Sequence, residues 1–239
     1  MRPGDEFFNL YTHGFIRVAM GVPESKVADP SFNTAKTIKL MQEAEDHQAV
    51  LILFPELNLS AYSCEDLFHQ QTLLDASIEA LRSVLKVSEK MDLVAIVGLP
   101  LQIDYLLFNC AVALHRGRLI GVVPKTYLPN YREFYELRQF APAAAARSEV
   151  VDLCGQQAVP FGERLLFHVR NVTHFTFFIE ICEDLWVPIP PSSFAALAGA
   201  TVTLNLSASN ITIGKHEYRH SLVANQSARC LGAYLYTAA

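Results

Sequence analysis

The sequence predicts an α/β fold of four layers, in which two mixed β-sheets pack together and helices cover their outer faces. Segments with strand and helix patterns alternate along the chain, and tight hairpin signals are mixed in with them. A single doubly wound parallel sheet lacks such hairpins, so two mixed sheets fit the pattern better. The hydrophobic fraction of 51% and the charged fraction of 18% supply enough apolar residues for a large core.

The N-terminal part of the chain predicts three strands and two helices. Residues 15–22, 49–54 and 93–100 are apolar runs of strand length, and the last two are continuous enough to be covered on both faces. Residues 32–47 and 73–91 repeat apolar positions near the helical period, with charged residues between them. This pattern is typical of amphipathic helices.

A hairpin and two irregular segments follow. Residues 106–114 and 119–123 are apolar runs joined by an Arg-Gly turn, which predicts a β-hairpin. Residues 124–140 are aromatic, charged and irregular. Residues 141–162 combine an alanine run with prolines and glycines, so we expect a surface excursion there.

The remainder of the chain again alternates strands with helices. We expect strands over residues 165–169, 175–181, 200–206 and 231–236, and helices over residues 192–199 and 215–230. The chain is one domain, residues 1–239, and it ends just after the last of these strands. Because natural domains seldom stop at such a point, we expect the N-terminal part of a longer protein. The strand edge left open there predicts a homo-oligomer.

Composition argues against several classes of partner. The net charge is −5 and no basic block occurs, which argues against binding nucleic acid or an anionic membrane. The N-terminus lacks the apolar segment of a signal peptide, and no apolar run is long enough to span a bilayer. The five cysteines are scattered without a C-x-x-C pair, and the eight histidines form no metal-binding motif. We therefore expect a cytoplasmic protein without a metal site.

The first candidate for a catalytic residue is Cys182, at the end of the apolar run 175–181. Glu183 and Asp184 follow it and suit the first turn of a helix. A cysteine at such a junction resembles a nucleophile elbow, in which a thiolate attacks a carbonyl and free backbone N–H groups bind the oxyanion. The alternative is that Cys182 is a buried packing residue, which is common for free cysteines. Cys64 lacks a preceding buried strand, and we expect it only to pack.

Glu56 and Lys125 occupy the same kind of position as Cys182. Glu56 follows the strand 49–54, and Lys125 follows the strand 119–123. Each alone could be a salt-bridged loop residue, but charged residues are seldom buried without a partner. With Cys182 they predict attack on a carbonyl, in which the glutamate takes the thiol proton and the lysine binds the oxyanion. The lysine would also lower the pKa of the thiol.

Three segments resemble the signature segments of the carbon–nitrogen hydrolase (nitrilase) superfamily. They are Phe54-Pro-Glu-Leu57, Pro124-Lys-Thr-Tyr-Leu-Pro129 and Glu180-Ile-Cys-Glu-Asp184, and their order and spacing match across almost the whole chain. The resemblance is closest to one branch, the glutaminase domains of glutamine-dependent NAD synthetases. The stretches that carry it are Leu59-Ser-Ala-Tyr-Ser-Cys-Glu-Asp-Leu67, Leu128-Pro-Asn-Tyr-Arg-Glu-Phe-Tyr-Glu136 and Asn205-Leu-Ser-Ala-Ser-Asn-Ile-Thr-Ile-Gly-Lys215.

The resemblance implies a nitrilase-type α-β-β-α sandwich and a triad of Glu56, Lys125 and Cys182. It also implies that Glu133, eight residues after Lys125, positions the lysine and the substrate. The alternative for Glu133 is a loop acid in solvent. The backbone N–H of Glu183 would complete the oxyanion hole with the lysine.

The branch further implies a pocket for glutamine. Its walls would be Tyr62 and Tyr131, and the amino-acid head group would be bound by Glu183, Ser207 and Ser209. A zwitterionic substrate needs a carboxylate for its ammonium group and hydroxyl or amide donors for its carboxylate. Trp186 either lines the pocket or packs in the core. Lys215 and Arg219 face the site or a partner, or are simple surface charges, and we favour the surface charge.

We expect a cysteine amidohydrolase that converts glutamine to glutamate and ammonia through a thioester. In the intact enzyme, the resemblance implies, ammonia passes to a C-terminal synthetase domain that amidates adenylylated nicotinic acid adenine dinucleotide. ATP and Mg²⁺ would belong to that domain, which this chain lacks, so we expect no cofactor here. Two rivals remain, namely a stand-alone amidase for another small amide and a non-catalytic assembly module.

Overall fold

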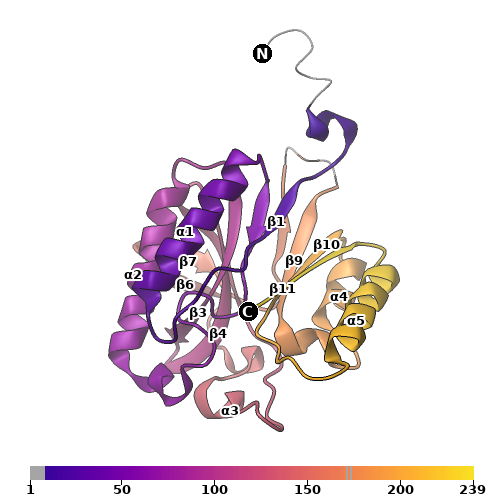
Figure 1. The fold of residues 1–239 in the computed structure, drawn as a ribbon. Coiled ribbons are helices and arrows are strands. Elements are labelled where there is room, and N and C mark those ends of the chain that lie inside the picture. Colours follow the sequence, from indigo (N-terminus) through magenta and orange to yellow (C-terminus); the bar gives the residue numbers. More distant parts are fainter. Residues whose placement is uncertain (1–8, 171, 173) are drawn as a thin grey trace.

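A computed structural model describes residues 9–170, 172 and 174–239 of the chain. Two mixed sheets pack together and helices cover both outer faces, which confirms the predicted architecture (Figure 1). The first eight residues, where the sequence shows no signal peptide, lie outside the described part.

The first sheet has five strands in the order β1-β2-β3-β4-β5. These strands are β1 (Val18–Met20), β2 (Leu51–Leu53), β3 (Val94–Ile103), β4 (Leu106–His115) and β5 (Arg118–Pro124). The strands β1, β2 and β3 pair in parallel, whereas β3, β4 and β5 form an antiparallel meander. As a result, β2, β3 and β5 run in one direction, and their carboxyl ends meet at one edge of the sheet.

The second sheet has the order β11-β10-β9-β8. Its strands are β8 (Leu166–His168), β9 (Thr176–Ile181), β10 (Val202–Ser207) and β11 (Ala233–Ala238). The strands β9, β10 and β11 are parallel, and β8 pairs with β9 in the antiparallel direction. Each sheet is therefore mixed, as the hairpin signals predict.

A hairpin of β6 (Val150–Leu153) and β7 (Gln156–Pro160) lies within the segment expected to be only a surface excursion. Most residues of these two strands are exposed or half-buried, so no continuous apolar run marks them. The turn between them places both Cys154 and Gly155 at positive φ, 51° and 80°. The sequence therefore offered only a weak hairpin signal at this point.

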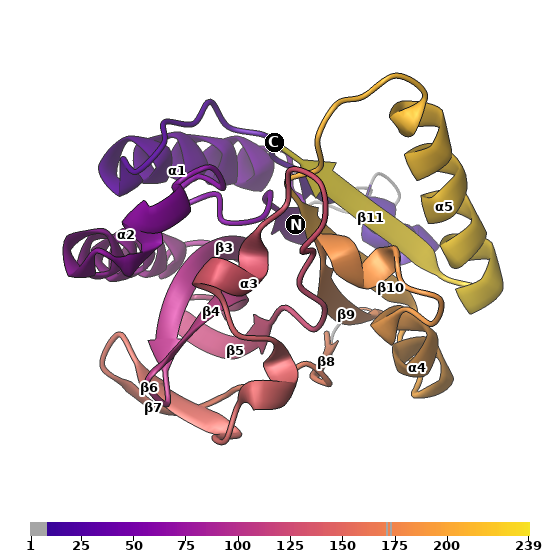
Figure 2. The ribbon, with the colours of Figure 1, turned by 90° about the horizontal axis from the view of Figure 1, so that it is seen from below.

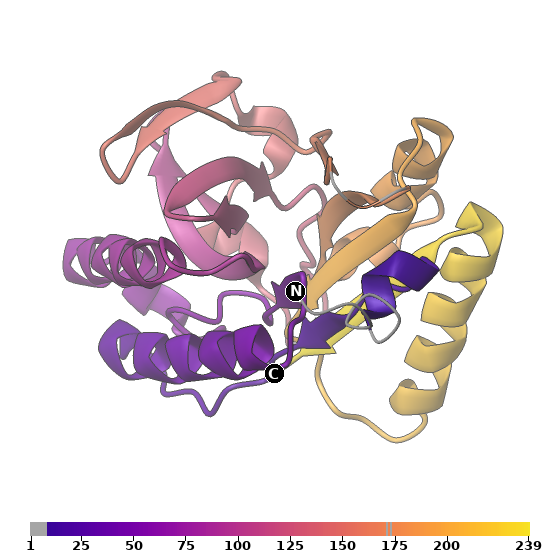
Figure 3. The same ribbon diagram turned by 90° about the horizontal axis from the view of Figure 1, so that it is seen from above.

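Two pairs of helices form the outer layers (Figures 2 and 3). The pair α1 (Pro30–Asp46) and α2 (Gln71–Ser88) covers the first sheet, and α4 (Pro191–Leu197) with α5 (Lys215–Cys230) covers the second. The shorter helices are η1 (Leu10–His13), η2 (Glu65–His69), α3 (Glu136–Gln139), η3 (Ala143–Ala145) and η4 (Cys182–Leu185). Over the described ranges, none of these helices is both long and apolar enough to cross a bilayer.

Side-chain alternation along the strands divides the core into layers. In β2, Ile52 packs toward the helices α1 and α2, whereas Leu51 and Leu53 pack between the two sheets. In β9, Ile179 faces the same inter-sheet core, and Phe178 packs on the other face against α4. Both faces of these strands are buried, which explains why their sequences are continuous apolar runs rather than alternating ones.

Gly98 of β3 lets the chain after β2 turn closely over the sheet. A Cβ atom at this position would lie 2.4 Å from the backbone nitrogen of Leu57, closer than real side chains approach. The Gly98 N–H donates to Asn58 Oδ1 at 2.8 Å, and its carbonyl accepts from the Leu59 N–H at 3.1 Å. This close packing fixes the turn that carries Glu56.

Candidate active site

Three charged or nucleophilic residues follow strands whose carboxyl ends share one side of the molecule. Glu56 follows β2, Lys125 follows β5 and Cys182 follows β9, so the first two come from one sheet and the third from the other. All three residues are buried, and the side chains of Glu56 and Lys125 have no exposed surface. The position of each residue thus agrees with the sequence-based prediction of a common site.

The Lys125 ammonium group lies between two carboxylates. Its Nζ donates to Glu56 Oε1 and to Glu136 Oε1, each at 2.6 Å. Burial on its own would lower the pKa of this lysine, but the two carboxylates outweigh it and raise the pKa well above its usual value. Lys125 therefore stays cationic, as a group that binds an oxyanion must.

One oxygen of Glu56 is left without a partner. Glu56 Oε1 accepts from Lys125 and from Asn109 Nδ2, the latter at 2.7 Å. Glu56 Oε2 is buried and has no hydrogen-bond partner among the described residues. A buried acceptor without a partner costs free energy, and such atoms are expected where a structure serves chemistry. This oxygen is available to accept a proton.

The second carboxylate on the lysine is Glu136, which corrects the expectation for Glu133. Glu136 begins the short helix α3 and accepts from the Tyr62 hydroxyl at 2.7 Å as well as from Lys125. Burial raises the pKa of Glu136 to about 7, although Lys125 acts to lower it. Glu133 is exposed and lines the mouth of the cavity described below. Because the segment between Lys125 and Glu136 is irregular, spacing alone could not tell which acid turns inward.

Cys182 occupies a sharp turn between β9 and the 3₁₀ helix η4. Its φ of 46° lies in the left-handed region, which is unfavourable for a residue with a side chain and is typical of a nucleophile elbow. Burial, followed by the charge of Glu56, raises the pKa of the Cys182 thiol, and the opposing effect of Lys125 is smaller. The lysine thus acts in the predicted direction, but the net shift is upward.

Asp184 connects the elbow to the loop that carries Lys125. Its carboxylate is buried and accepts from the backbone N–H groups of Ile181 at 2.9 Å and Tyr127 at 2.8 Å. A longer contact of 3.4 Å joins it to the N–H of Thr126. The sequence indicated only an acid in the first turn of a helix at Asp184. In the structure, Asp184 also connects the Cys182 elbow on one sheet to the loop after Lys125 on the other.

A cavity of about 440 Å³ opens onto Cys182. Its walls include Tyr131, Glu133, Phe134, Glu183, Trp186, Ser209, Asn210, Lys215 and Tyr218. The Tyr131 hydroxyl contacts both Glu183 oxygens, at 3.1 and 3.2 Å. Four of the residues predicted to bind the substrate therefore lie in this lining, and they are Tyr131, Glu183, Trp186 and Ser209.

The other two predicted pocket residues do not line this cavity. Ser207 is fully buried and donates to Asn205 Oδ1 at 2.8 Å. That same oxygen accepts from the Cys182 N–H at 3.2 Å, so Ser207 supports the elbow indirectly. Tyr62 contacts Glu136 and is not part of this lining. Asn109 did not stand out in the sequence, and Asn205 was only the first residue of a stretch of resemblance, because a buried asparagine has no distinctive local pattern.

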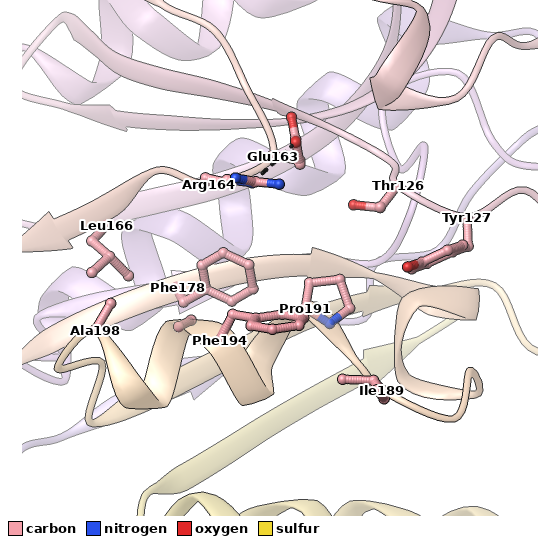
Figure 4. A pocket seen from close by; sticks show the side chains of 11 residues that line it. Thr126, Tyr127, Glu163, Arg164, Leu166, Phe178, Ile189, Pro191, Phe194 and Ala198 are labelled. Atoms are coloured by element: carbon pink, nitrogen blue, oxygen red, sulfur yellow. Dashed lines mark ion pairs between the residues drawn. The ribbon is translucent and has the colours of Figure 1, made fainter.

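A second cavity, of about 380 Å³, lies between α4 and the loop after β5 (Figure 4). Its lining is largely apolar, with Phe178, Pro191 and Phe194 on one side. Glu163 and Arg164 form an ion pair at 3.5 Å on the other side. None of the three strand-end residues lines it, so the chemistry belongs to the cavity at Cys182.

Comparison with known proteins decides the family. Residues 17–239 match the carbon–nitrogen hydrolase family. The chain belongs to this family. This carbon–nitrogen hydrolase is similar to the glutamine-dependent NAD(+) synthetase of Mycobacterium tuberculosis, with 47% identity over 98% of the chain described here. It spans only 34% of the length of that relative.

Solved structures show the same carbon–nitrogen hydrolase fold. A glutamine-dependent NAD(+) synthetase from Cytophaga hutchinsonii superposes with a TM-score of 0.81 at 27% identity, covering 93% of this chain and 36% of that one. An amidase from a Nesterenkonia species superposes with a TM-score of 0.71 at 18% identity, covering 92% and 75% of the two chains. The second likeness concerns the fold alone.

The raised pKa of Cys182 predicts how the thiol reacts with pH. Because burial and Glu56 keep the proton on the sulfur, the thiolate fraction should grow about tenfold per pH unit throughout the range from pH 7 to 9. The rate of alkylation of Cys182 by iodoacetamide, followed by mass spectrometry of its peptide, should rise in parallel. A rate that levels off below pH 8 would show instead that Lys125 has already formed a stable thiolate.

Proposed function

We propose that this chain hydrolyses the side-chain amide of glutamine to glutamate and ammonia. The observation that carries the proposal is the buried Glu56–Lys125 ion pair beside a cysteine that opens onto a cavity with charged walls. Glu56 would act as the base and Lys125 would stabilise the oxyanion. The cavity supplies the carboxylate of Glu183 for an amino-acid head group. The names of the similar proteins, glutamine-dependent NAD(+) synthetases, support the choice of glutamine.

In the first half of the reaction, Glu56 Oε2 would take the proton of the Cys182 thiol. The sulfur attacks the amide carbon, and the carbonyl oxygen becomes an oxyanion. The Lys125 ammonium and the Glu183 backbone N–H would stabilise this charge. The C–N bond then breaks as Glu56 returns the proton to the leaving nitrogen, so that ammonia departs and a γ-glutamyl thioester remains on Cys182.

In the second half, water replaces the amide nitrogen. Glu56 would take a proton from the attacking water, the same groups would hold the oxyanion, and the C–S bond would break. Glutamate leaves and the sulfur regains its proton. Neither half needs a cofactor in this domain.

The cavity residues would hold the substrate in place. Glu183, oriented by Tyr131, would bind the ammonium group of glutamine, and Ser209 would donate to the head group. Trp186 would form an apolar wall for the methylene groups. Tyr62 would act through Glu136, and Ser207 through Asn205, because neither lines the cavity.

The relatives are about three times as long as the matched region, since the chain spans 34% of the M. tuberculosis protein. We infer that this chain is the glutaminase part of a longer cytoplasmic enzyme. Its ammonia would feed a C-terminal synthetase domain that makes NAD from the deamido dinucleotide. ATP and Mg²⁺ would bind in that domain.

Replacement of Cys182 tests the proposed reaction against the two alternative functions, a stand-alone amidase and a non-catalytic assembly module. Cys182→Ala should abolish ammonia release from glutamine, whereas Cys64→Ala should keep most of it, because Cys64 is a packing residue 1% exposed. A thiol-alkylating glutamine analogue should label Cys182 stoichiometrically, and glutamine should block the labelling. Labelling blocked better by another amide would favour the stand-alone amidase, and no labelling at all would favour the assembly module.

A matched pair of variants tests the partner of the lysine. Glu136→Gln removes one of the two carboxylates on Lys125 and should lower kcat by about tenfold or more, with a smaller change in KM. Glu133→Gln leaves both carboxylates on Lys125 and should mainly change KM. If Glu133→Gln gives the larger loss of kcat, the assignment of Glu136 is wrong.

We also propose that copies of the chain associate. Among the described residues, β11 is the edge strand of its sheet, and an edge strand favours pairing with another chain. Light scattering at micromolar concentration should therefore give a mass above the 26.6 kDa of one chain. A single species of one-chain mass would contradict the proposal.

A further inference from the structure

Three polar side chains of the second sheet form a chain of hydrogen bonds that ends at the Cys182 elbow. They are Glu180 of β9, Asn205 of β10 and Tyr234 of β11, from three neighbouring parallel strands. Glu180 and Asn205 are opposite each other in the register, and both are buried. Because side chains alternate along a strand, they lie on the face that α4 and α5 cover, away from the inter-sheet core.

Each hydrogen bond in this chain has a defined donor and acceptor. The Tyr234 hydroxyl donates to Glu180 Oε1, and its oxygen accepts from Asn205 Nδ2 at 3.0 Å. At the other end of the amide, Asn205 Oδ1 accepts from the Cys182 N–H at 3.2 Å and from the Ser207 hydroxyl at 2.8 Å. The chain therefore runs in one direction, from the backbone of the elbow to the carboxylate.

The carboxylate of Glu180 determines that direction. An ionised carboxylate only accepts hydrogen bonds, and Glu180 Oε2 already accepts from the Ser192 N–H at 2.9 Å. Burial raises the pKa of Glu180, but the hydrogen bonds from Tyr234 and Ser192 act to lower it and so favour the ionised acceptor. Tyr234 then gives its single proton to Glu180, and its oxygen is left to accept from Asn205. The carbonyl oxygen of Asn205 is thereby turned toward Cys182.

The elbow needs such a contact because its backbone is strained. Cys182 has a φ of 46°, and a residue with a side chain keeps this conformation only where its surroundings hold it. An Asn205 amide turned the other way would place its NH₂ donor against the Cys182 N–H. The next N–H along the chain, that of Glu183, is the one proposed to bind the oxyanion, so the same turn orients both the thiol and this donor.

We propose that Asn205 is a positioning residue that holds the Cys182 elbow in its reactive conformation, and that Tyr234 and Glu180 fix the orientation of its amide. The inference rests on the proposed glutamine hydrolysis, in which Cys182 is the nucleophile. None of the three residues is in the lining of the cavity at Cys182. They act through the elbow rather than on the substrate, so their loss should affect kcat rather than KM.

The first test is a double-mutant cycle on glutamine hydrolysis. Tyr234→Phe keeps the ring and removes the hydroxyl, and it should lower kcat by about tenfold with a change in KM below about twofold. Asn205→Ala should lower kcat at least as much. Because Tyr234 acts through Asn205, the double variant should be no slower than Asn205→Ala alone. Counting active sites by covalent labelling of Cys182 keeps unfolded protein out of these rates.

The second test measures the elbow itself and does not need turnover. Hydrogen exchange of the peptide that covers residues 182–186, followed by mass spectrometry, should become about tenfold faster in Tyr234→Phe. Peptides from β2 and β3 of the first sheet should keep their exchange rates. Thr203→Val is the matched control, because Thr203 is buried on the same face of β10 and takes no part in the hydrogen bonds named above. It should change neither kcat nor exchange.

The opposite results are distinct from a failure of the proposed function. Losses of kcat that multiply in the double variant, a change confined to KM, or unchanged exchange in Tyr234→Phe would each overturn the positioning role. If Asn205→Ala does not fold, the kcat and the exchange rate of Tyr234→Phe decide the matter. A wild-type chain that does not hydrolyse glutamine would reject the proposed function, and the exchange rates would still decide whether Tyr234 and Asn205 hold the elbow.

Discussion

The site depends on one buried cation between two buried carboxylates. Without Lys125, the carboxylates of Glu56 and Glu136 would be two like charges in a dry environment, which is strongly unfavourable. With it, the cluster still carries an excess of negative charge when both acids are ionised. Burial, together with that excess of negative charge, explains why the pKa of the nearby Cys182 thiol lies above that of an ordinary thiol. In the proposed reaction, the thiol would therefore keep its proton until Glu56 takes it at the moment of attack.

Local sequence patterns predicted the three strand-end residues well. Glu56, Lys125 and Cys182 each follow a continuous apolar run, and a polar residue directly after a strand buried on both faces is an unusual local signal. Apolar runs and hairpin signals predicted the strands of the two sheets, and the helix predicted over residues 215–230 has the observed bounds of α5. These predictions succeeded because periodicity and burial are properties of a short window.

The residues that were missed depend on the path of irregular segments. Glu136 rather than Glu133 reaches the lysine because of how residues 126–135 cross the site, and no period in the sequence encodes that path. Asn109 and Asn205 are buried asparagines whose partners come from distant parts of the chain. Lys215 was assigned to the surface because its cavity neighbours, Trp186 and Phe134, are far from it in the sequence.

Glu56 and Lys125 follow strands of one sheet and Cys182 follows a strand of the other, so the proposed reaction would make the inter-sheet core part of the catalytic apparatus. Because the base and the thiol are attached to different sheets, the thickness of the apolar layer between the sheets would set the gap that the thiol proton crosses in the proposed reaction. Side chains in that layer therefore act as spacers as well as stabilisers. Adding or removing a methyl group in this layer can leave the protein folded and still misalign Glu56 and Cys182, because catalytic groups must be held within about half an ångström. Sequence drift in this layer should thus be limited more tightly by turnover than by folding.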